Sequence, residues 1–123
     1  MIEDTGLYVK AWNGLPGALI KWFLERSGPT AVCRMLASFE DRSALAKTAI
    51  VVYDGTPHTF LGVIDGRIPV EPRGNNGFGW DSIFVPYGDS RTFAEMSALE
   101  KDHYSMRRLA AEQMLKSGIV WQE

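Results

Sequence analysis

Apolar positions along the chain change between helical and strand spacing, and glycine or proline marks most of the changes. Large apolar side chains recur at helical intervals over residues 19–26, and Gly28 follows as a natural helix end. Pro29 suits the first turn of a second short helix. By the same rule, Pro16 is expected in the first turn of the earlier helix, directly after a turn at 13–17.

The middle of the chain has strand character. Residues 44–53 are rich in β-formers, and a turn at 54–57 separates them from a second such run at 58–64. This order predicts a β-hairpin, with a further turn at Asp65-Gly66. A loop rich in glycine and proline follows, and residues 82–85 are expected to form a short strand.

The two ends complete the predicted fold. Residues 7–9 are expected to be extended, and the apolar stripe of 103–117 predicts a last helix, with Asp102 as its N-cap and Gly118 as its end. Helices, hairpin, loop, strand and helix in this order indicate a mixed α+β fold with a mixed, twisted sheet. A chain of 123 residues is expected to form a single domain over 1–123.

Composition and charge narrow the functional classes. Thirteen Lys and Arg stand against fifteen Asp and Glu, so the net charge of −2 shows no basic excess for nucleic-acid binding. No apolar run approaches the roughly 20 residues of a membrane span, and the acidic start does not resemble a signal peptide. Cys33 is the single cysteine, which excludes an internal disulfide, and its place in an apolar helical pattern predicts a core position. These features predict a soluble cytoplasmic protein that binds neither nucleic acid nor membranes.

The first segment with chemical potential is Glu3-Asp4-Thr5-Gly6, which places two carboxylates and a hydroxyl beside a glycine. Carboxylate oxygens suit Mg²⁺, which also takes water and substrate phosphate as ligands. A carboxylate at this point is also able to accept a proton from an attacking water molecule. The alternative interpretation is a solvated chain terminus with a turn.

The second segment is Gly77-Phe78-Gly79-Trp80-Asp81, in which two glycines allow close backbone approach to a flat ligand. The rings of Phe78 and Trp80 are suited to stacking on a base, which contributes roughly 1–3 kcal/mol per base. The carboxylate of Asp81 accepts hydrogen bonds from ribose or from ring N–H groups. The alternative is an aromatic turn packed into the core.

The third segment runs from Glu100 to Arg107, where the last helix is expected to begin. Free N–H groups at a helix N-terminus favour anionic or acceptor ligands, and Lys101 and Arg107 add cationic donors. The planar guanidinium of Arg107 suits a carbonyl oxygen. The alternative is an ordinary capped amphipathic helix.

Taken together and in order, these segments resemble the inosine triphosphate pyrophosphatase family over nearly the whole chain. Each motif is weak alone, but the ordered set is specific. The matching segments are Glu3–Leu7, Asn13–Gly17, Ile20–Leu24, Pro72–Gly74, Phe78–Asp81 with Phe84 and Pro86, Thr92–Met96, Glu100-Lys101, and Ser105 with Arg107.

The resemblance implies a Mg²⁺-dependent hydrolase that converts ITP, dITP and XTP to monophosphate and pyrophosphate, and so removes damaged purines from the nucleotide pool. It assigns Asp4 as the general base or metal-site carboxylate, with Glu3 assisting at the metal. Arg107 matches the residue that recognises the 6-oxo group, and Met106 stands where the family has histidine. The residues that it implies in substrate binding are Thr5, Phe78, Gly79, Trp80, Asp81, Lys101, Ser105, Met106 and Arg107.

This chain begins two residues before Glu3. Family members carry an earlier segment with a phosphate-binding Thr-Gly-Asn turn, a lysine and a metal-binding glutamate. Without that segment an apolar sheet edge or face is expected to be exposed, and a second copy of the chain is expected to cover it as a homodimer. Three hypotheses follow: an active pyrophosphatase, a catalytically impaired purine nucleotide-binding or assembly module, and a remnant without ligand.

Overall fold

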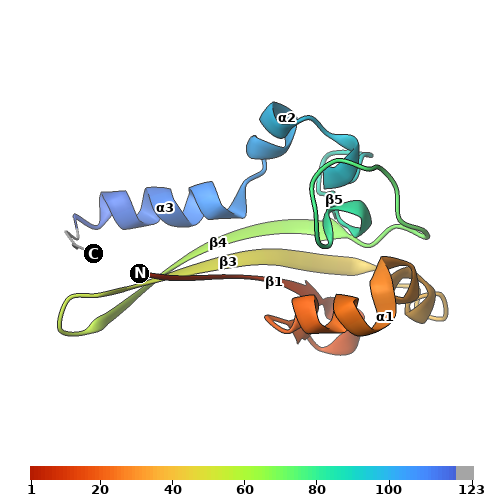
Figure 1. The fold of residues 1–123 in the computed structure, drawn as a ribbon, viewed down its shortest axis with the longest axis horizontal. Helices are drawn as coiled ribbons and strands as arrows, with labels where there is room; N and C mark the ends of the chain where they lie inside the picture. Colours follow the sequence, from red (N-terminus) through yellow and green to blue (C-terminus); the bar gives the residue numbers. More distant parts are fainter. Residues whose placement is uncertain (119–123) are drawn as a thin grey trace.

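The computed structural model describes residues 1–118, which build a five-stranded sheet in the order β2-β1-β3-β4-β5 (Figure 1). The strands are β1 (Ile2–Val9), β2 (Leu15–Gly17), β3 (Ser43–Tyr53), β4 (Pro57–Arg67) and β5 (Val85–Pro86). The helices are α1 (Ile20–Met35), α2 (Ala98–Asp102) and α3 (Met106–Lys116), with short 3-10 helices η1 (Lys10–Trp12), η2 (Asp81–Ile83) and η3 (Phe93–Glu95).

The α+β class predicted from the sequence is confirmed, but the expected mixed sheet is wrong for the described residues. Every pair of neighbouring strands in residues 1–118 is antiparallel. For β1–β2 and β3–β4 the physical reason is the short connection, because a parallel pair needs a crossover of a dozen or more residues.

The β3–β4 hairpin is the longest feature of the sheet and confirms the predicted hairpin. Alternate residues of β3 are buried along its whole length, as expected for a sheet with one covered face. β4 runs through the turn predicted at Asp65-Gly66, and Gly66 pairs with Pro86 of β5. A Cβ on Gly66 would overlap the ring of Phe84. This glycine therefore permits close packing, and the predicted turn was wrong.

α1 contains the break that the sequence predicts. Gly28 has a non-helical backbone with φ 78°, and Pro29 begins the second half of the helix. Pro16, in contrast, lies in β2 opposite Tyr8, so its expected place in a helix was wrong. A short strand at the edge of a sheet tolerates the missing N–H of proline.

The final helix predicted over 103–117 is confirmed as α3, which begins three residues later, and the short helix α2 directly before it was not predicted. Ser105, and not Asp102, is the N-cap of α3, because its hydroxyl accepts a hydrogen bond from the Arg108 N–H. Asp102 is the last residue of α2. The strand expected at 82–85 is also wrong, since η2 occupies its first half and only the two residues of β5 pair with the sheet.

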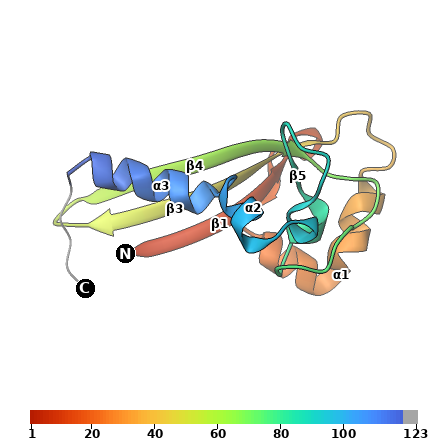
Figure 2. The ribbon, with the colours of Figure 1, turned by 90° about the horizontal axis from the view of Figure 1, so that it is seen from above.

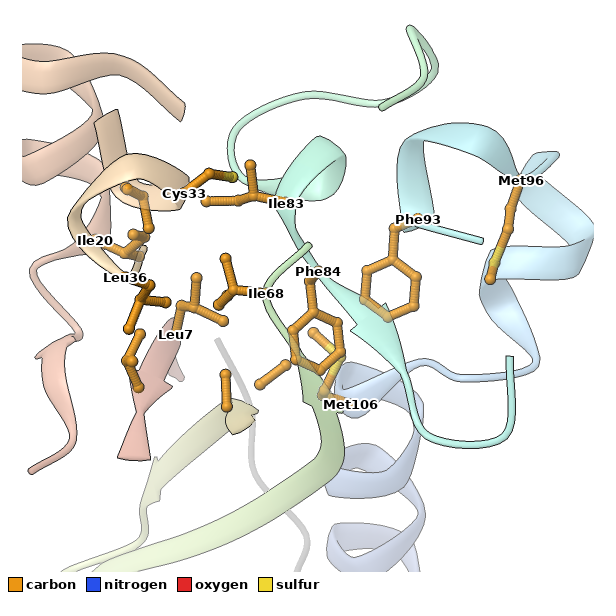
Figure 3. Packing of buried hydrophobic residues seen from close by; sticks show 14 residues of the cluster. Leu7, Ile20, Cys33, Leu36, Ile68, Ile83, Phe84, Phe93, Met96 and Met106 are labelled. Atoms are coloured by element: carbon orange, nitrogen blue, oxygen red, sulfur yellow. The ribbon is translucent and has the colours of Figure 1, made fainter. Parts of the chain in front are cut away.

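The main core lies where α1, β1 and the segment after β4 meet (Figure 3). Leu7, Ile20 and Leu36 face Ile68 and Phe84 in this cluster, and all five are buried. The predicted core position of Cys33 is confirmed by its burial. The ribbon views show α1 at one end of the sheet and α3 running beside β4 of the hairpin (Figures 1 and 2).

The position of α3 depends on a close backbone contact at Gly62 of β4. A Cβ at this position would overlap the backbone carbonyl of Met106, at the first residue of the helix. Gly62 pairs with Thr48 of β3, which in turn pairs with Thr5 of β1. The start of α3 is therefore held over one row of residues that crosses three strands.

We call the side of the sheet that packs on α3 and the core the covered face, and the other side the open face. Side chains of the open face include Ile2, Tyr53, Leu61 and Val63, with exposed fractions of 70%, 71%, 46% and 42%. β2 pairs only with Leu7–Val9, so the first half of β1 has a free edge within the described chain. The exposed apolar face expected from the sequence is thus present. None of the described helices combines the length and the apolar character that crossing a bilayer requires.

Candidate functional site

A cavity of about 430 Å³ lies between the covered face of the sheet, the loop around Trp80 and the start of α3. This volume is in the range of pockets for small molecules. All the residues that the sequence indicated for binding reach this cavity, and so does Glu3, whereas Asp4 does not. Its lining residues are Glu3, Thr5, Thr48, Phe78, Gly79, Trp80, Asp81, Phe93, Ala98, Lys101, Asp102, Ser105, Met106 and Arg107.

A pair of hydroxyl groups reaches the cavity from the sheet. Thr5 and Thr48 are direct neighbours across β1 and β3, and their Oγ1 atoms are 2.9 Å apart. Sequence reasoning missed Thr48, although a signal was present. It is the polar position in the otherwise apolar row Ala44, Ala46, Ile50 and Val52 on the buried side of the predicted strand.

Aromatic rings form one wall of the cavity. The ring of Trp80 packs edge-on against Phe84 at 5.6 Å between centroids and lies 6.2 Å from Phe93. Phe78 has an exposed fraction of 85%, so the core does not pack around its ring. Trp80 is therefore held by the core, whereas Phe78 presents its ring to solvent beside the cavity.

Asp81 and Lys101 form the polar centre of the site. The Lys101 Nζ donates to Asp81 Oδ2 at 2.7 Å, and the Phe78 backbone N–H donates to the same oxygen at 3.1 Å. Asp81 is buried, with 6% exposure. Gly77, in the left-handed region with φ 75°, makes room for this carboxylate, because a Cβ there would overlap Asp81 Oδ2. The absence of a side chain at Gly77 thus allows Asp81 to keep this position.

A second ion pair bridges the cavity between β1 and α3. The Arg107 Nε lies 3.1 Å from a carboxylate oxygen of Glu3, with side-chain exposures of 71% and 25%. An exposed pair of this kind contributes little to stability, about 0–1 kcal/mol. Its importance is geometric, since it holds the guanidinium beside the cavity.

A charged network fixes α2 and hence Lys101. Arg91 binds both Asp89 and Glu100, and the Tyr104 hydroxyl donates to Asp89 at 3.1 Å. Hydrogen bonds from Arg91 hold the pKa of Asp89 well below its usual range. The Ser97 backbone N–H, and then Arg91, lower the pKa of Glu100 to about 2. Desolvation, followed by the neighbouring Asp89, raises the pKa of Tyr104.

Asp4 lies away from the groups described so far. Successive side chains of a strand point to opposite faces, so Asp4 is on the open face while Glu3 and Thr5 line the cavity. Asp4 is exposed and sits on the half of β1 that has a free edge in the described chain. The structure therefore does not bring the two carboxylates of the Glu3-Asp4 pair to one point.

A larger hollow of about 770 Å³ lies toward the open face, beside Tyr8, Lys47 and Asp65. None of the catalytic, metal-binding or substrate-binding residues predicted from the sequence lines it, although Asn13, Gly14 and Pro86 of the matching segments do. The smaller cavity on the covered face, which combines stacking rings, two ion pairs and two hydroxyls, is therefore the candidate site.

Comparison with known proteins gives concordant matches. A family model described as the Ham1 family matches residues 1–117. An inosine triphosphate pyrophosphatase of Schizosaccharomyces pombe is 46% identical over 114 residues, which are 90% of this chain and 60% of that protein. A dITP/XTP pyrophosphatase of Thermococcus kodakarensis is 42% identical over 106 residues, 86% of this chain and 58% of that protein.

Among solved structures, a HAM1 protein from Coxiella burnetii superposes with a TM-score of 0.84 at 34% identity. The match covers 94% of this chain and 64% of that one. The chain thus spans between 58% and 64% of the length of these three proteins.

Proposed function

The chain belongs to the Ham1 family, and on this premise we propose that it carries the nucleoside-binding part of a nucleoside triphosphate pyrophosphatase. The substrates would be deaminated purine nucleotides, namely ITP, dITP and XTP, and the products the monophosphate and pyrophosphate. The observation that carries the proposal is the cavity, where Trp80, Asp81, Lys101 and Arg107 meet from separate segments of the chain. The names of the relatives from yeast and Thermococcus point to the same chemistry.

Selectivity for a deaminated base follows from the donor properties of Arg107. Hypoxanthine and xanthine carry a carbonyl at position 6, where adenine carries an amino group. Since Glu3 engages Nε, the terminal nitrogens of Arg107 remain able to donate to that carbonyl. The amino group of adenine would place a second hydrogen-bond donor against the donors of Arg107. A site built for an acceptor rejects such a ligand strongly.

The ribose and the ring faces would be held by the other groups of the cavity. Trp80, backed by Phe84 and Phe93, offers a fixed surface for stacking. Asp81 accepts hydrogen bonds from ribose hydroxyls, and Lys101 supplies positive charge beside it. Both groups are preorganised in the structure, so little ordering is needed on binding.

In the hydrolytic step, Asp4 would act as general base. It accepts a proton from water, the water oxygen bonds to phosphorus, the α–β phosphoanhydride bond breaks and pyrophosphate leaves. The Asp4 side chain points to the opposite face of β1 from Thr5. A phosphate tail that leaves the cavity at Thr5 would therefore have to pass around the edge of β1 to reach the Asp4 carboxylate.

The structure offers Mg²⁺ one carboxylate, that of Asp4, and not the pair that the sequence indicated. Glu3 and Asp4 point to opposite faces of β1, and Glu3 is engaged by Arg107. Within residues 1–118 no group of three or more potential metal-binding side chains occurs. Asp4 together with phosphate oxygens would hold Mg²⁺, which binds few protein carboxylates. When bound, the ion would neutralise charge on the phosphates.

A homodimer in the cytoplasm is also part of the proposal. Ile2, Tyr53, Leu61 and Val63 expose apolar surface on the open face, and such surface is commonly covered in a folded protein. The buried thiol of Cys33 suits a reducing compartment. Light scattering during gel filtration tests the dimer, and a monomer mass at micromolar concentration would contradict it.

Measuring pyrophosphate release from ITP, XTP and GTP in the presence of Mg²⁺, for the wild type and for Asp4→Asn, tests the enzymatic proposal. We expect release from ITP and XTP that the substitution reduces by at least about a hundredfold, as for loss of a general base. If there is no turnover but IMP raises the melting temperature in the wild type and not in Trp80→Ala, the site binds nucleotides without hydrolysing them. If neither response occurs, the proposal is wrong.

A further inference from the structure

We propose that Thr48 is a specificity-determining residue that binds the nucleoside, acting with Thr5 as a hydroxyl pair that donates one hydrogen bond to the ligand. The inference rests on the proposed function. It adds a contact from the middle of the β3–β4 hairpin, a segment that none of the motifs recognised in the sequence includes.

The pair occupies a defined place in the cavity. Thr48 is 1% exposed and lies directly between Thr5 of β1 and Gly62 of β4. Because the start of α3 is in close contact with the backbone at Gly62, Thr48 lies close to the turn that carries Ser105 and Arg107. Both hydroxyls and both of these residues line the same cavity.

The two hydroxyl groups of Thr5 and Thr48 carry more protons than their mutual hydrogen bond uses. Each threonine hydroxyl carries one proton and can also accept. One proton is used in the 2.9 Å contact between the two Oγ1 atoms, and neither hydroxyl has another hydrogen-bonding partner within the described chain. The second proton therefore remains for a group inside the cavity. The partner it fits is a neutral acceptor on the nucleoside, a purine carbonyl or ring nitrogen or a ribose oxygen.

Packing alone does not explain a threonine at this position. Valine has almost the same shape, and the other buried positions of β3 are alanine, isoleucine and valine. A hydroxyl buried with incomplete hydrogen bonding costs free energy that a methyl group would not. A ligand that accepts the remaining proton removes this cost, and it removes it only when bound.

The test compares Thr48→Val, Thr48→Ser and the control Thr59→Val. Thr59 pairs with Val51, so it lies on the open face of the neighbouring strand, and it is exposed. Calorimetric titration with IMP and with dIMP gives the affinity, and melting curves without ligand report on the fold. Thr48→Val is expected to weaken IMP binding about tenfold. Thr48→Ser and Thr59→Val are expected to stay within about twofold of the wild type.

The outcomes separate the two levels of the proposal. If the wild type binds IMP and Thr48→Val binds it equally well, the role of Thr48 is refuted and the proposed function stands. If the wild type does not bind IMP, the role of Thr48 in nucleoside binding is refuted, and the proposed function is refuted as well if ITP yields no pyrophosphate. If Thr48→Ser is as weak as Thr48→Val and both melt at lower temperature, Thr48 is a structural residue and the inference fails. A tenfold loss that is equal for IMP and dIMP supports an acceptor that both nucleotides carry, on the base or elsewhere on the ribose, whereas a loss confined to IMP supports the ribose 2′-hydroxyl.

Discussion

Replacing Gly77 with alanine tests how the loop positions the charged centre of the site. The residue has φ 75°, and its Cβ would overlap Asp81 Oδ2. The carboxylate must then move away from Lys101 Nζ, 2.7 Å distant, and from the Phe78 N–H, 3.1 Å distant. Gly79 provides a matched control for stability, because its φ is 64° but no atom other than those of its chain neighbours lies within 4 Å of its Cβ position.

The two variants share one cost and differ in the other. The left-handed backbone costs an alanine about 1–2 kcal/mol in either place. Disturbing the bonds to Asp81 adds about 1–2 kcal/mol for Gly77→Ala, at the lower end for charged groups because Lys101 is 34% exposed. The expected losses of unfolding free energy are therefore about 2–4 kcal/mol for Gly77→Ala and about 1–2 kcal/mol for Gly79→Ala.

Urea denaturation followed by tryptophan fluorescence measures both losses, and titration with IMP measures the site. Gly77→Ala should bind IMP at least about tenfold more weakly than the wild type, since one hydrogen bond to a charged group is at stake. Equal stabilities of the two variants, together with wild-type IMP affinity in Gly77→Ala, would refute the claim that Gly77 is needed to hold Asp81.

Three further predictions concern other parts of the molecule. Arg107→Ala should reduce the preference for IMP over AMP, measured by calorimetric titration, by about tenfold. It should change the free energy of unfolding by less than about 0.5 kcal/mol, because the side chain is 71% exposed. An unchanged preference would argue against base recognition by Arg107. The lowered pKa values of Asp89 and Glu100 mean that their network stabilises the fold above their ordinary values of 3.8 and 4.5 and loses this effect as pH falls toward 2. The urea midpoint should therefore drop over that range, and less steeply in Arg91→Leu; parallel pH curves would contradict the assignment. Gly62→Ala should destabilise the fold by about 1–3 kcal/mol, because the added Cβ would overlap the backbone at the start of α3 and overpack this contact. An unchanged urea midpoint would show that α3 does not depend on close contact with Gly62.

Local patterns determined the elements that need no distant neighbour. The β3–β4 hairpin follows from two runs of strand-forming residues around a turn, and the break in α1 follows from Gly28 and Pro29. The turn predicted at Gly66 and the helix start predicted at Pro16 were wrong, because glycine and proline also occur within strands. Gly66 accommodates the ring of Phe84, which the chain brings in from a later segment, and no local pattern contains that information.

The candidate site divides in the same way. The motifs around Trp80 and Lys101 were recognisable because each is contiguous, and the chemistry of a side chain is a local property. Their meeting in one cavity with Thr48 depended on strand register. The separation of Glu3 from Asp4 onto opposite faces followed from the extension of β1 back to Ile2, where the sequence predicted extended structure only over 7–9. The sequence by itself determined which chemical groups are present and which segments favour helix or strand. Only the tertiary structure decided which groups face each other, because that depends on packing between residues far apart in the chain.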